Sequence, residues 1–240
     1  MYRQLFDAES GTYTYLLAFD RYAVLIDPVL EQVERDLRLL YELELKLLTC
    51  LETHVHADHV TGAGELRAQT GCKTVVPDGA KMSCADWALR DGQLFRLGQI
   101  ELEAITTPGH TNHHMAYYWP QQKRVFTGDA LLIRGCGRTD FQNGDAGQLY
   151  DSVTERLFSL PDDTRVHPAH DYHGQTASTI GEEKRWNPRF VQLQQSGHHL
   201  RSRSDFIDLM GHLKLGLPKK MMEAIPANEH CGQMILADAA

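Results

Sequence analysis

The alternation of apolar and polar residues predicts a hairpin, a helix and a further strand at the start of the chain. Residues 12–19 are aromatic and β-branched, and residues 22–26 form a second short apolar run, so together they predict a β-hairpin. Apolar residues then recur at helical spacing over residues 31–44, which predicts an amphipathic helix. Residues 46–51 form another apolar run, typical of a strand, which leads directly into a histidine-rich segment.

The pattern of apolar and polar residues over the remainder of the chain predicts two helices, at residues 64–69 and 149–160. It predicts strands at 74–76, 94–106 (two strands around Gly98), 115–119, 124–127 and 165–167. Strands followed by helices, then strands and a helix again, indicate an α/β fold with helices outside two sheets. From about residue 181 the chain is polar and helix-prone. We therefore expect one α/β domain over residues 1–180, with a C-terminal helical extension over 181–240 packed on it.

The composition argues against several classes of function. The 240 residues include 24 basic and 32 acidic side chains, a formal charge of −8. Such a chain lacks the basic face that nucleic acid or an anionic membrane would require, so we expect neither as a partner. No apolar run approaches the ~18 residues of a membrane span, and the first residues lack a secretory or organelle-targeting pattern. These features predict a cytoplasmic protein.

The cysteines give no pattern that indicates a site, whereas the histidines do. The five cysteines are widely spaced and include no Cys-x-x-Cys pair, so we expect reduced thiols rather than a disulfide framework. The 13 histidines are more informative, because several of them stand close to aspartates. Eight histidines are not among the candidate metal ligands given below and are expected at the surface or around those ligands: His113, His114, His167, His173, His198, His199, His212 and His230.

Candidate metal ligands follow several of the predicted strands. They are His54, His56, Asp58 and His59 after the strand 46–51, His110 in Pro-Gly-His-Thr, Asp129 in Thr-Gly-Asp-Ala, and His170 in Pro-Ala-His-Asp. Neutral imidazole and carboxylate groups suit borderline divalent metals. Loops at one edge of a sheet can aim residues from distant parts of a chain at one point. The pattern therefore predicts a metal site, but the donors alone do not select iron over zinc.

In this order, the seven donors resemble the five signature motifs of the metallo-β-lactamase superfamily, over about residues 12–175. The resemblance implies a four-layer αβ/βα sandwich with the metal site at the edge between two sheets. Taken alone, these motifs also fit a two-zinc thioesterase such as hydroxyacylglutathione hydrolase. In that alternative His54, His56 and His110 would bind one zinc, Asp58, His59 and His170 the other, and Asp129 would bridge them.

A longer stretch favours a different member of the superfamily. The sequence DALLIRGCGRTDFQ at residues 129–142 resembles the persulfide dioxygenase family, as do residues 12–17, 53–62 and 168–172. The resemblance implies one Fe(II) per chain, and the ligands it assigns are His54, His110 and Asp129. It places His56, Asp58, His59 and His170 around the metal without binding it. Three protein ligands on one face of Fe(II) would leave three positions open for a persulfide sulfur and O₂.

The same resemblance implies a reaction and a substrate, namely oxidation of glutathione persulfide by O₂ and water to glutathione and sulfite. Glutathione carries two carboxylates, which cationic and hydroxyl groups would bind. Arg138, Tyr172 and Arg189 match family positions near the glutathione pocket. Cys136 is expected to be structural rather than a nucleophile, and a homodimer is expected because relatives commonly form one. A third alternative is a non-catalytic sulfur-binding protein, which the intact donor set disfavours.

Overall fold

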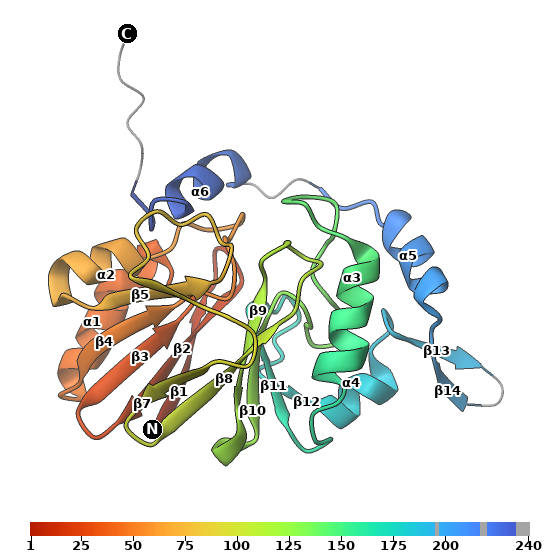
Figure 1. Cartoon of the computed structure of the whole chain (residues 1–240), viewed down its shortest axis with the longest axis horizontal. Coiled ribbons are helices and arrows are strands. Elements are labelled where there is room, and N and C mark those ends of the chain that lie inside the picture. The colour runs from red at the N-terminus through yellow and green to blue at the C-terminus, as the bar shows by residue number, and fades with distance from the viewer. Residues whose placement is uncertain (195–196, 217–219, 234–240) are drawn as a thin grey trace, which may run out of the picture. The chain divides into compact units, whose positions relative to one another are not determined.

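The computed structural model describes residues 1–194, 197–216 and 220–233, and it divides into two units, each with a six-stranded sheet (Figure 1). The first unit comprises Met1–Leu89, Leu97–Ile100 and the described residues from Gly216 onwards. The second comprises Arg90–Arg96 and Glu101–Leu215. The candidate donors fall into both units.

The sheet of the first unit has its strands in chain order. They are β1 (Tyr2–Asp7), β2 (Thr12–Phe19), β3 (Tyr22–Ile26), β4 (Lys46–Leu51), β5 (Lys73–Pro77) and β6 (Trp87–Leu89). The first three strands pair antiparallel, and β3 to β6 pair parallel. Parallel neighbours need a crossover, and here helices provide two of the crossovers: η1 (Leu30–Gln32) with α1 (Val33–Glu42), and α2 (Ala63–Thr70).

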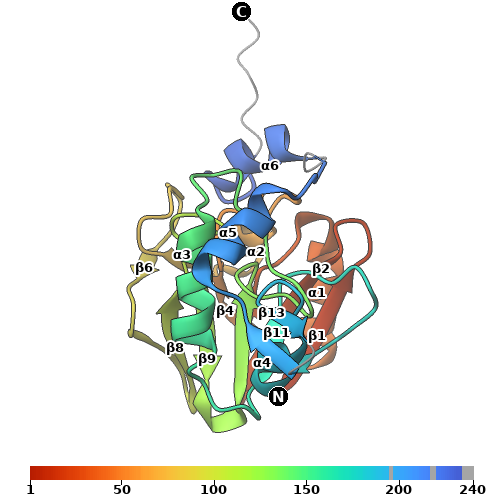
Figure 2. The same ribbon diagram turned by 90° about the vertical axis from the view of Figure 1, so that its right-hand side faces the viewer.

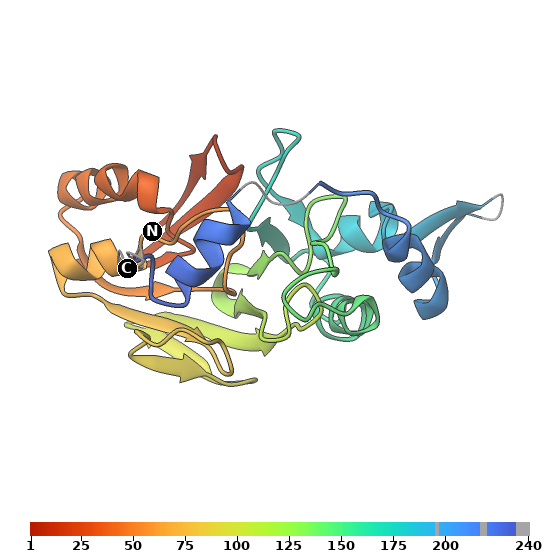
Figure 3. The same ribbon diagram turned by 90° about the horizontal axis from the view of Figure 1, so that it is seen from above.

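Both crossover helices cover the same face of this sheet (Figures 1 and 3). Val33 and Leu40 of α1 and Leu66 of α2 pack against Leu25 of β3 and Leu47 of β4, and all five side chains are buried. Burying a leucine of this kind contributes about 1.5–3 kcal/mol. The helices cover the face of the sheet but not the carboxyl ends of its strands. The loops after β3 and β4 lie at those ends and can carry polar side chains.

The sheet of the second unit runs in the order β12-β11-β10-β9-β8-β7. Its strands are β7 (Leu94–Leu97), β8 (Ile100–Thr106), β9 (Met115–Trp119), β10 (Arg124–Gly128), β11 (Arg165–Pro168) and β12 (Ser178–Thr179). In this sheet β10 and β11 pair parallel, whereas β8 with β9, β9 with β10 and β11 with β12 pair antiparallel. The crossover between these two strands contains α3 (Ala146–Asp151), continued by the π-helical turn η3 (Ser152–Leu157).

Helices also pack on the second sheet. Leu149 and Val153, from the predicted helix 149–160, are fully buried with Phe190 and with Phe206 of α5 (Arg203–Gly211). Figure 2 shows α3 and α5 lying against each other. The packing fixes the connection between β10 and β11, and with it the loops that follow both strands.

The C-terminal extension is helical in part and also contains a hairpin that the sequence pattern did not predict. Its helices are α4 (Ile180–Trp186), α5 and α6 (Met221–Asn228), and its hairpin joins β13 (Val191–Gln194) to β14 (Gly197–Leu200). The part of the predicted extension at 195–196, 217–219 and 234–240 lies outside the described residues. The domain boundary at residue 180 stays a prediction. None of the helices in the described part of the chain is long and apolar enough to cross a bilayer.

The expectation that no disulfide forms is wrong for one pair. Cys84 and Cys231, in the first unit, are joined by a disulfide across a Cα–Cα distance of 6.0 Å. They are 147 residues apart, so sequence spacing gave no signal that the fold brings them together. Cys50, Cys72 and Cys136 are free thiols, as expected.

Buried His167 on β11 gives a testable pH effect. The Arg124 guanidinium donates to its Nε2 at 2.8 Å. Burial, and then the positive charges of Arg124 and Arg165, lower the pKa of His167 from 6.5 to about 3. As the pH falls, the unfolded chain therefore binds a proton at His167 near pH 6.5, whereas the folded chain binds it only near pH 3. This contribution to stability is complete above pH 6.5 and is lost progressively as the pH falls to about 3.

We expect His167→Gln, which keeps a side-chain acceptor for Arg124, to lose less stability than the parent between pH 6.5 and 3. The difference in slope should be about one proton, or roughly 1.4 kcal/mol per pH unit. Urea unfolding at a series of pH values measures it. If the free energy of unfolding depends on pH equally in the two proteins, folding does not lower the pKa of His167.

Candidate metal centre

The loop after β4 begins with a hydrogen-bond chain that orients His54. Asp27, which follows β3, accepts from the Thr53 amide (2.7 Å) and from the Thr53 hydroxyl (2.9 Å). Because that hydroxyl gives its one proton to Asp27, its oxygen accepts from His54 Nδ1 at 2.9 Å. The Nε2 atom of His54 then carries the lone pair, which is the form in which an imidazole binds a metal.

His56 lies between two buried carboxylates. Its Nε2 is 3.2 Å from Asp27 Oδ1 and 3.6 Å from Glu52 Oε2. Burial by itself lowers the pKa of His56, but Asp27 first and then Glu52 outweigh it, and the pKa lies well above its usual value. Two carboxylates on one side of the ring hold His56 in place within the loop.

The remaining donors of this loop complete a compact cluster. The ring centroids of His54 and His56 are 4.1 Å apart, and those of His56 and His59 are 4.3 Å apart. Asp58 pairs with His59 through Oδ2 and Nδ1 at 2.9 Å. Asp58 is partly exposed, whereas the three histidines are buried. The first unit thus brings together all four donors that the sequence predicted in this segment.

In the second unit, His110 is held in the same tautomer as His54. Its Nδ1 lies 2.7 Å from the Arg138 carbonyl oxygen, which can only accept, so the proton is on Nδ1. The Nε2 atom faces Asp129 Oδ2 at 3.4 Å. A backbone carbonyl on one ring nitrogen, leaving the other available, is the usual arrangement of a metal-binding histidine.

Asp129, in the loop after β10, is positioned by a further histidine. Its backbone N–H donates to His114 Nε2 at 2.9 Å, and His114 Nδ1 lies 2.8 Å from the Thr107 hydroxyl. The Asp129 carboxylate lies between His110 and His170, whose Nε2 is 3.6 Å from Oδ1. The second unit therefore gathers the other three predicted donors, with His110 and His170 beside the buried carboxylate of Asp129.

Three residues that take part in this arrangement were missed by the sequence analysis or given no role by it. Asp27 and Glu52 hold the donor loop, and their only signal is that each acid directly follows a predicted apolar strand. His114 was expected at the surface or around the site; it is buried and fixes the backbone of Asp129.

Arg134 and Asp140, two charged residues of the 129–142 stretch, form ion pairs with other residues and not with each other. Arg134 pairs with Glu182 and Glu183, whereas Asp140 accepts two hydrogen bonds from Arg138, each 2.7 Å long. Local geometry explains the second pair, because residues two apart on this loop can form a planar, two-bond contact.

The three predicted substrate contacts also lie in the second unit. The Arg138 guanidinium lies 4.3 Å from the ring centroid of Phe141. Tyr172 is 68% exposed and stacks on His170 with ring centroids 6.0 Å apart. Arg189 is half-buried, and its charge acts on Cys136.

The surroundings of Cys136 do not suit a nucleophile. Burial raises the pKa of this thiol to about 12, and the nearby charge of Arg189 offsets only part of that effect. The thiolate, not the thiol, is the reactive form of cysteine. The structural role expected for Cys136 therefore agrees with its environment.

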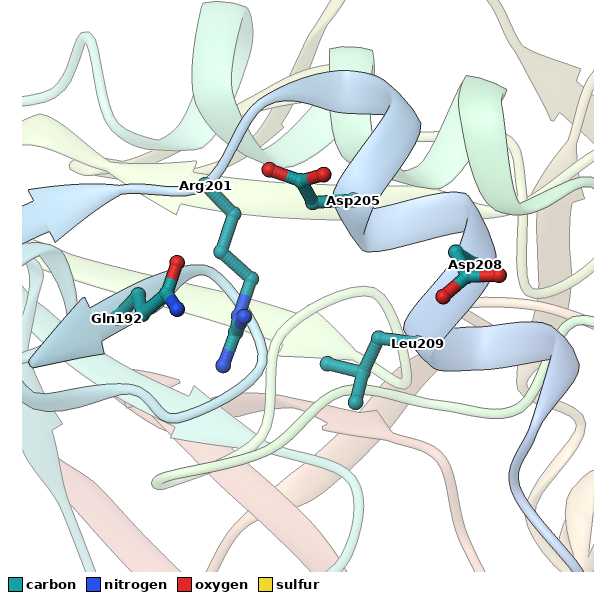
Figure 4. A pocket seen from close by; sticks show the side chains of 5 residues that line it. All are labelled: Gln192, Arg201, Asp205, Asp208 and Leu209. Carbon is teal, nitrogen blue, oxygen red and sulfur yellow. The ribbon is translucent and has the colours of Figure 1, made fainter.

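A separate hollow of about 320 Å³ lies against α5 in the second unit (Figure 4). The Arg201 side chain extends between Gln192 and Leu209, with Asp205 and Asp208 along the helix. The hollow contains none of the predicted donors, and its two carboxylates more than offset the positive charge of Arg201. It offers no chemistry comparable to the donor clusters.

Comparison with known proteins identifies the family. Residues 8–170 match the family model of the metallo-beta-lactamase superfamily. The human protein named persulfide dioxygenase ETHE1, mitochondrial, is 47% identical over 235 residues, which cover 96% of this chain and 88% of that protein. The crystal structure of ETHE1 from Myxococcus xanthus is 51% identical, with a TM-score of 0.90, and covers 97% of this chain and 100% of that one. The chain belongs to the persulfide dioxygenase family. Membership makes it an oxidoreductase and confirms the predicted fold class and resemblance.

Likeness to the hydroxyacylglutathione hydrolases is weaker: a probable one from Schizosaccharomyces pombe is 30% identical over 240 residues, or 85% of this chain and 92% of that protein. A hydroxyacylglutathione hydrolase from Methylococcus capsulatus is 43% identical, but over only 124 residues, or 51% of this chain and 47% of that protein. The superfamily and the donor clusters in both units support a metal-binding protein.

Proposed function

We propose that this enzyme oxidises glutathione persulfide with O₂ and water, releasing glutathione and sulfite. One persulfide, one O₂ and one water give one glutathione and one sulfurous acid, so the outer sulfur loses the four electrons that O₂ gains. The observation that carries the proposal is the similarity to persulfide dioxygenases along nearly the whole chain, 96% of it in the human comparison. The hydroxyacylglutathione hydrolases match either a shorter part of the chain, 51% of it at 43% identity, or a longer part, 85% of it, at only 30% identity.

We further propose that His54, His110 and Asp129 hold one Fe(II) per chain. In support, both histidines are tied through Nδ1, and Asp129 is a buried carboxylate 3.4 Å from His110 Nε2. Two imidazoles and one carboxylate form the ligand set typical of non-haem iron oxygenases, whereas zinc cannot exchange electrons with O₂. Bound Fe(II) would supply that redox chemistry together with open positions for O₂ and the persulfide sulfur.

The neighbouring residues are proposed to support this site without binding the metal. His56 fits that role because its Nε2 atom faces two buried carboxylates, Asp27 and Glu52. Asp58, His59 and His170 would hydrogen-bond water or orient the ligands. We assign glutathione contacts to Arg138, Tyr172 and Arg189, whose cationic and hydroxyl groups suit the two carboxylates of the tripeptide.

Metal content and oxygen uptake test this function directly. We expect about one iron per chain, and O₂ consumption with glutathione persulfide at a ratio of about one to one, with sulfite as the second product. S-lactoylglutathione, the thioester that a hydroxyacylglutathione hydrolase would cleave, should remain intact. About two zincs per chain with thioester cleavage would instead support the two-zinc hydrolase. Persulfide binding without turnover of either compound would support the non-catalytic alternative.

A homodimer and a cytoplasmic location are also part of the proposal. The mammalian relatives carry the word mitochondrial in their names, so location is to be tested in the cells that make this protein. Light scattering of the purified protein tests the dimer.

A further inference from the structure

Helix α6 (Met221–Asn228) and the described residues after it contact the donor loop of the first unit. Helix α6 ends at Asn228, and the described residues that follow it, 229–233, run back past the loop that joins β4 to α2. Figure 1 shows α6, in dark blue, near the helices and strands of that unit. Ala224 and Ala227 of the helix are buried against Val60, which directly follows the donors.

Asn228 makes three hydrogen bonds to this loop. Its side-chain nitrogen donates to the backbone carbonyls of His56 (2.8 Å) and His59 (2.9 Å). Its side-chain oxygen accepts from the Thr61 amide at 2.8 Å. The side chain is buried, with 1% of its surface exposed. A single amide thus connects three points along a segment that has no regular secondary structure of its own.

The chemistry of these partners requires an amide at this position. The nitrogen faces two carbonyls that can only accept, and the oxygen faces an N–H that can only donate, so the orientation of the group is fixed. Aspartate has the same shape, but its carboxylate would meet two carbonyl oxygens. Alanine would leave buried backbone groups without these hydrogen bonds, at a cost comparable to a lost hydrogen bond for each.

The segment after Asn228 is itself anchored at several points. Cys231 is joined to Cys84 by the disulfide, its carbonyl accepts from the Gly64 amide at 2.9 Å, and its side chain packs with Val55 of the donor loop. The Ser83 amide donates to the Glu229 carbonyl at 2.9 Å. A methyl group on Gly64 would lie 2.3 Å from the Cys231 carbonyl oxygen, so the contact tolerates only glycine.

We propose that Asn228 is a positioning residue of the metal centre, and that the Cys84–Cys231 disulfide holds it against the donor loop. Asn228 binds no metal and touches no substrate. It sets the backbone path between His56 and His59, and the ring centroid of His56 lies 4.1 Å from that of His54. The inference rests on the proposed function in taking His54 as a ligand, but it does not depend on the identity of the metal or of the reaction.

The test compares Asn228→Ala and Asn228→Asp with Met222→Ala, a control in the same helix at a side chain that is 86% exposed. Competition with a chelator measures the affinity for Co(II), and the visible spectrum of the Co(II) protein reports the ligand geometry. We expect both Asn228 variants to bind Co(II) about 10- to 100-fold more weakly, with an altered spectrum at full occupancy. The control should match the parent protein.

Parental affinity and an unchanged Co(II) spectrum in Asn228→Asp would overturn the proposal, provided that the metal-free variant unfolds at the parental temperature. If both Asn228 variants fail to fold, Gly64→Ala serves instead, because it displaces Cys231 without altering a polar group. Weaker Co(II) binding in that folded variant is expected, and parental binding would overturn the proposal.

The disulfide is tested with Cys84→Ser, which removes the bond and leaves the Asn228 hydrogen bonds possible. We expect Co(II) to dissociate faster in this variant, with a smaller loss of affinity than in Asn228→Ala. Equal dissociation rates in Cys84→Ser and the parent would show that the disulfide does not hold Asn228 in place. These readings need neither O₂ nor persulfide, so they stand even if the parent enzyme does not oxidise persulfide.

Discussion

Asp129→Ala is expected to remove both metal and activity, whereas His59→Ala should retain the metal. Asp129 would be the only anionic ligand, and its carboxylate lies beside the Nε2 atoms of both His110 and His170. Without it, two neutral imidazoles remain to hold a dication. We expect metal content to fall below about 0.1 per chain and kcat/KM to fall by about three orders of magnitude.

His59 is the matched comparison, because it is also buried and paired but is not a proposed ligand. Its Nδ1 faces Asp58, and its ring contacts His56. Its removal should lower activity about 10- to 100-fold while metal content stays near one per chain. Elemental analysis and O₂ uptake on the same samples measure both quantities. Asp163→Ala, at an exposed ion pair of the second unit, controls for loss of a carboxylate. Equal metal loss in Asp129→Ala and His59→Ala would indicate two metals.

The fold elements that carry the donors were predictable because their signals are local. The apolar run at residues 46–51 is the strand β4, and the run at 115–119 is β9, with the same limits in the sequence and in the structure. The clustered donors 54–59 lie in one short loop, so their meeting required no knowledge of the fold. Weaker signals failed, as in the hairpin of β13 and β14, where only four residues form each strand.

Residues that act through distant contacts were not predictable. Asn228 lies 172 positions from His56, and Cys84 lies 147 positions from Cys231. Neither residue type is unusual in its local sequence, and only the packing of α6 reveals what each one meets. His114 was similarly ambiguous, because a histidine close to a donor motif can face solvent or the backbone of Asp129. A sequence motif identifies groups that react or bind, but not the groups that hold them.

Gly137→Ala is expected to cause the second-largest loss of activity, although glycine has no side chain to take part in the chemistry. A methyl group at this position would lie 2.4 Å from the Asp129 carbonyl oxygen and 2.8 Å from His110 Nδ1. It would therefore collide with two proposed ligands at once. The Gly137 amide also donates to the Asp129 carbonyl at 2.7 Å, so the two backbone segments cannot separate without losing that bond.

Gly135→Ala provides a matched control two residues away in the same loop. There the nearest atom to an added methyl group would be Leu132 Cβ at 3.6 Å, an ordinary contact. Neither Gly135 nor Gly137 has a positive φ, so backbone conformation does not distinguish the two substitutions. The two substitutions differ only in the close contacts that a methyl group at residue 137 would make with Asp129 and His110.

We expect Gly137→Ala to lower metal affinity and kcat/KM by roughly 100-fold, the range seen when the orientation of a ligand is disturbed. Gly135→Ala should stay within about twofold of the parent protein, since an ordinary contact costs little. Chelator competition and O₂ uptake, with thermal unfolding of the metal-free proteins, separate loss of metal from loss of fold. If the two variants behave alike, the close approach of Gly137 to the ligands is not required. If only Gly137→Ala loses metal while remaining folded, the loop at residues 129–138 sets the position of both His110 and Asp129.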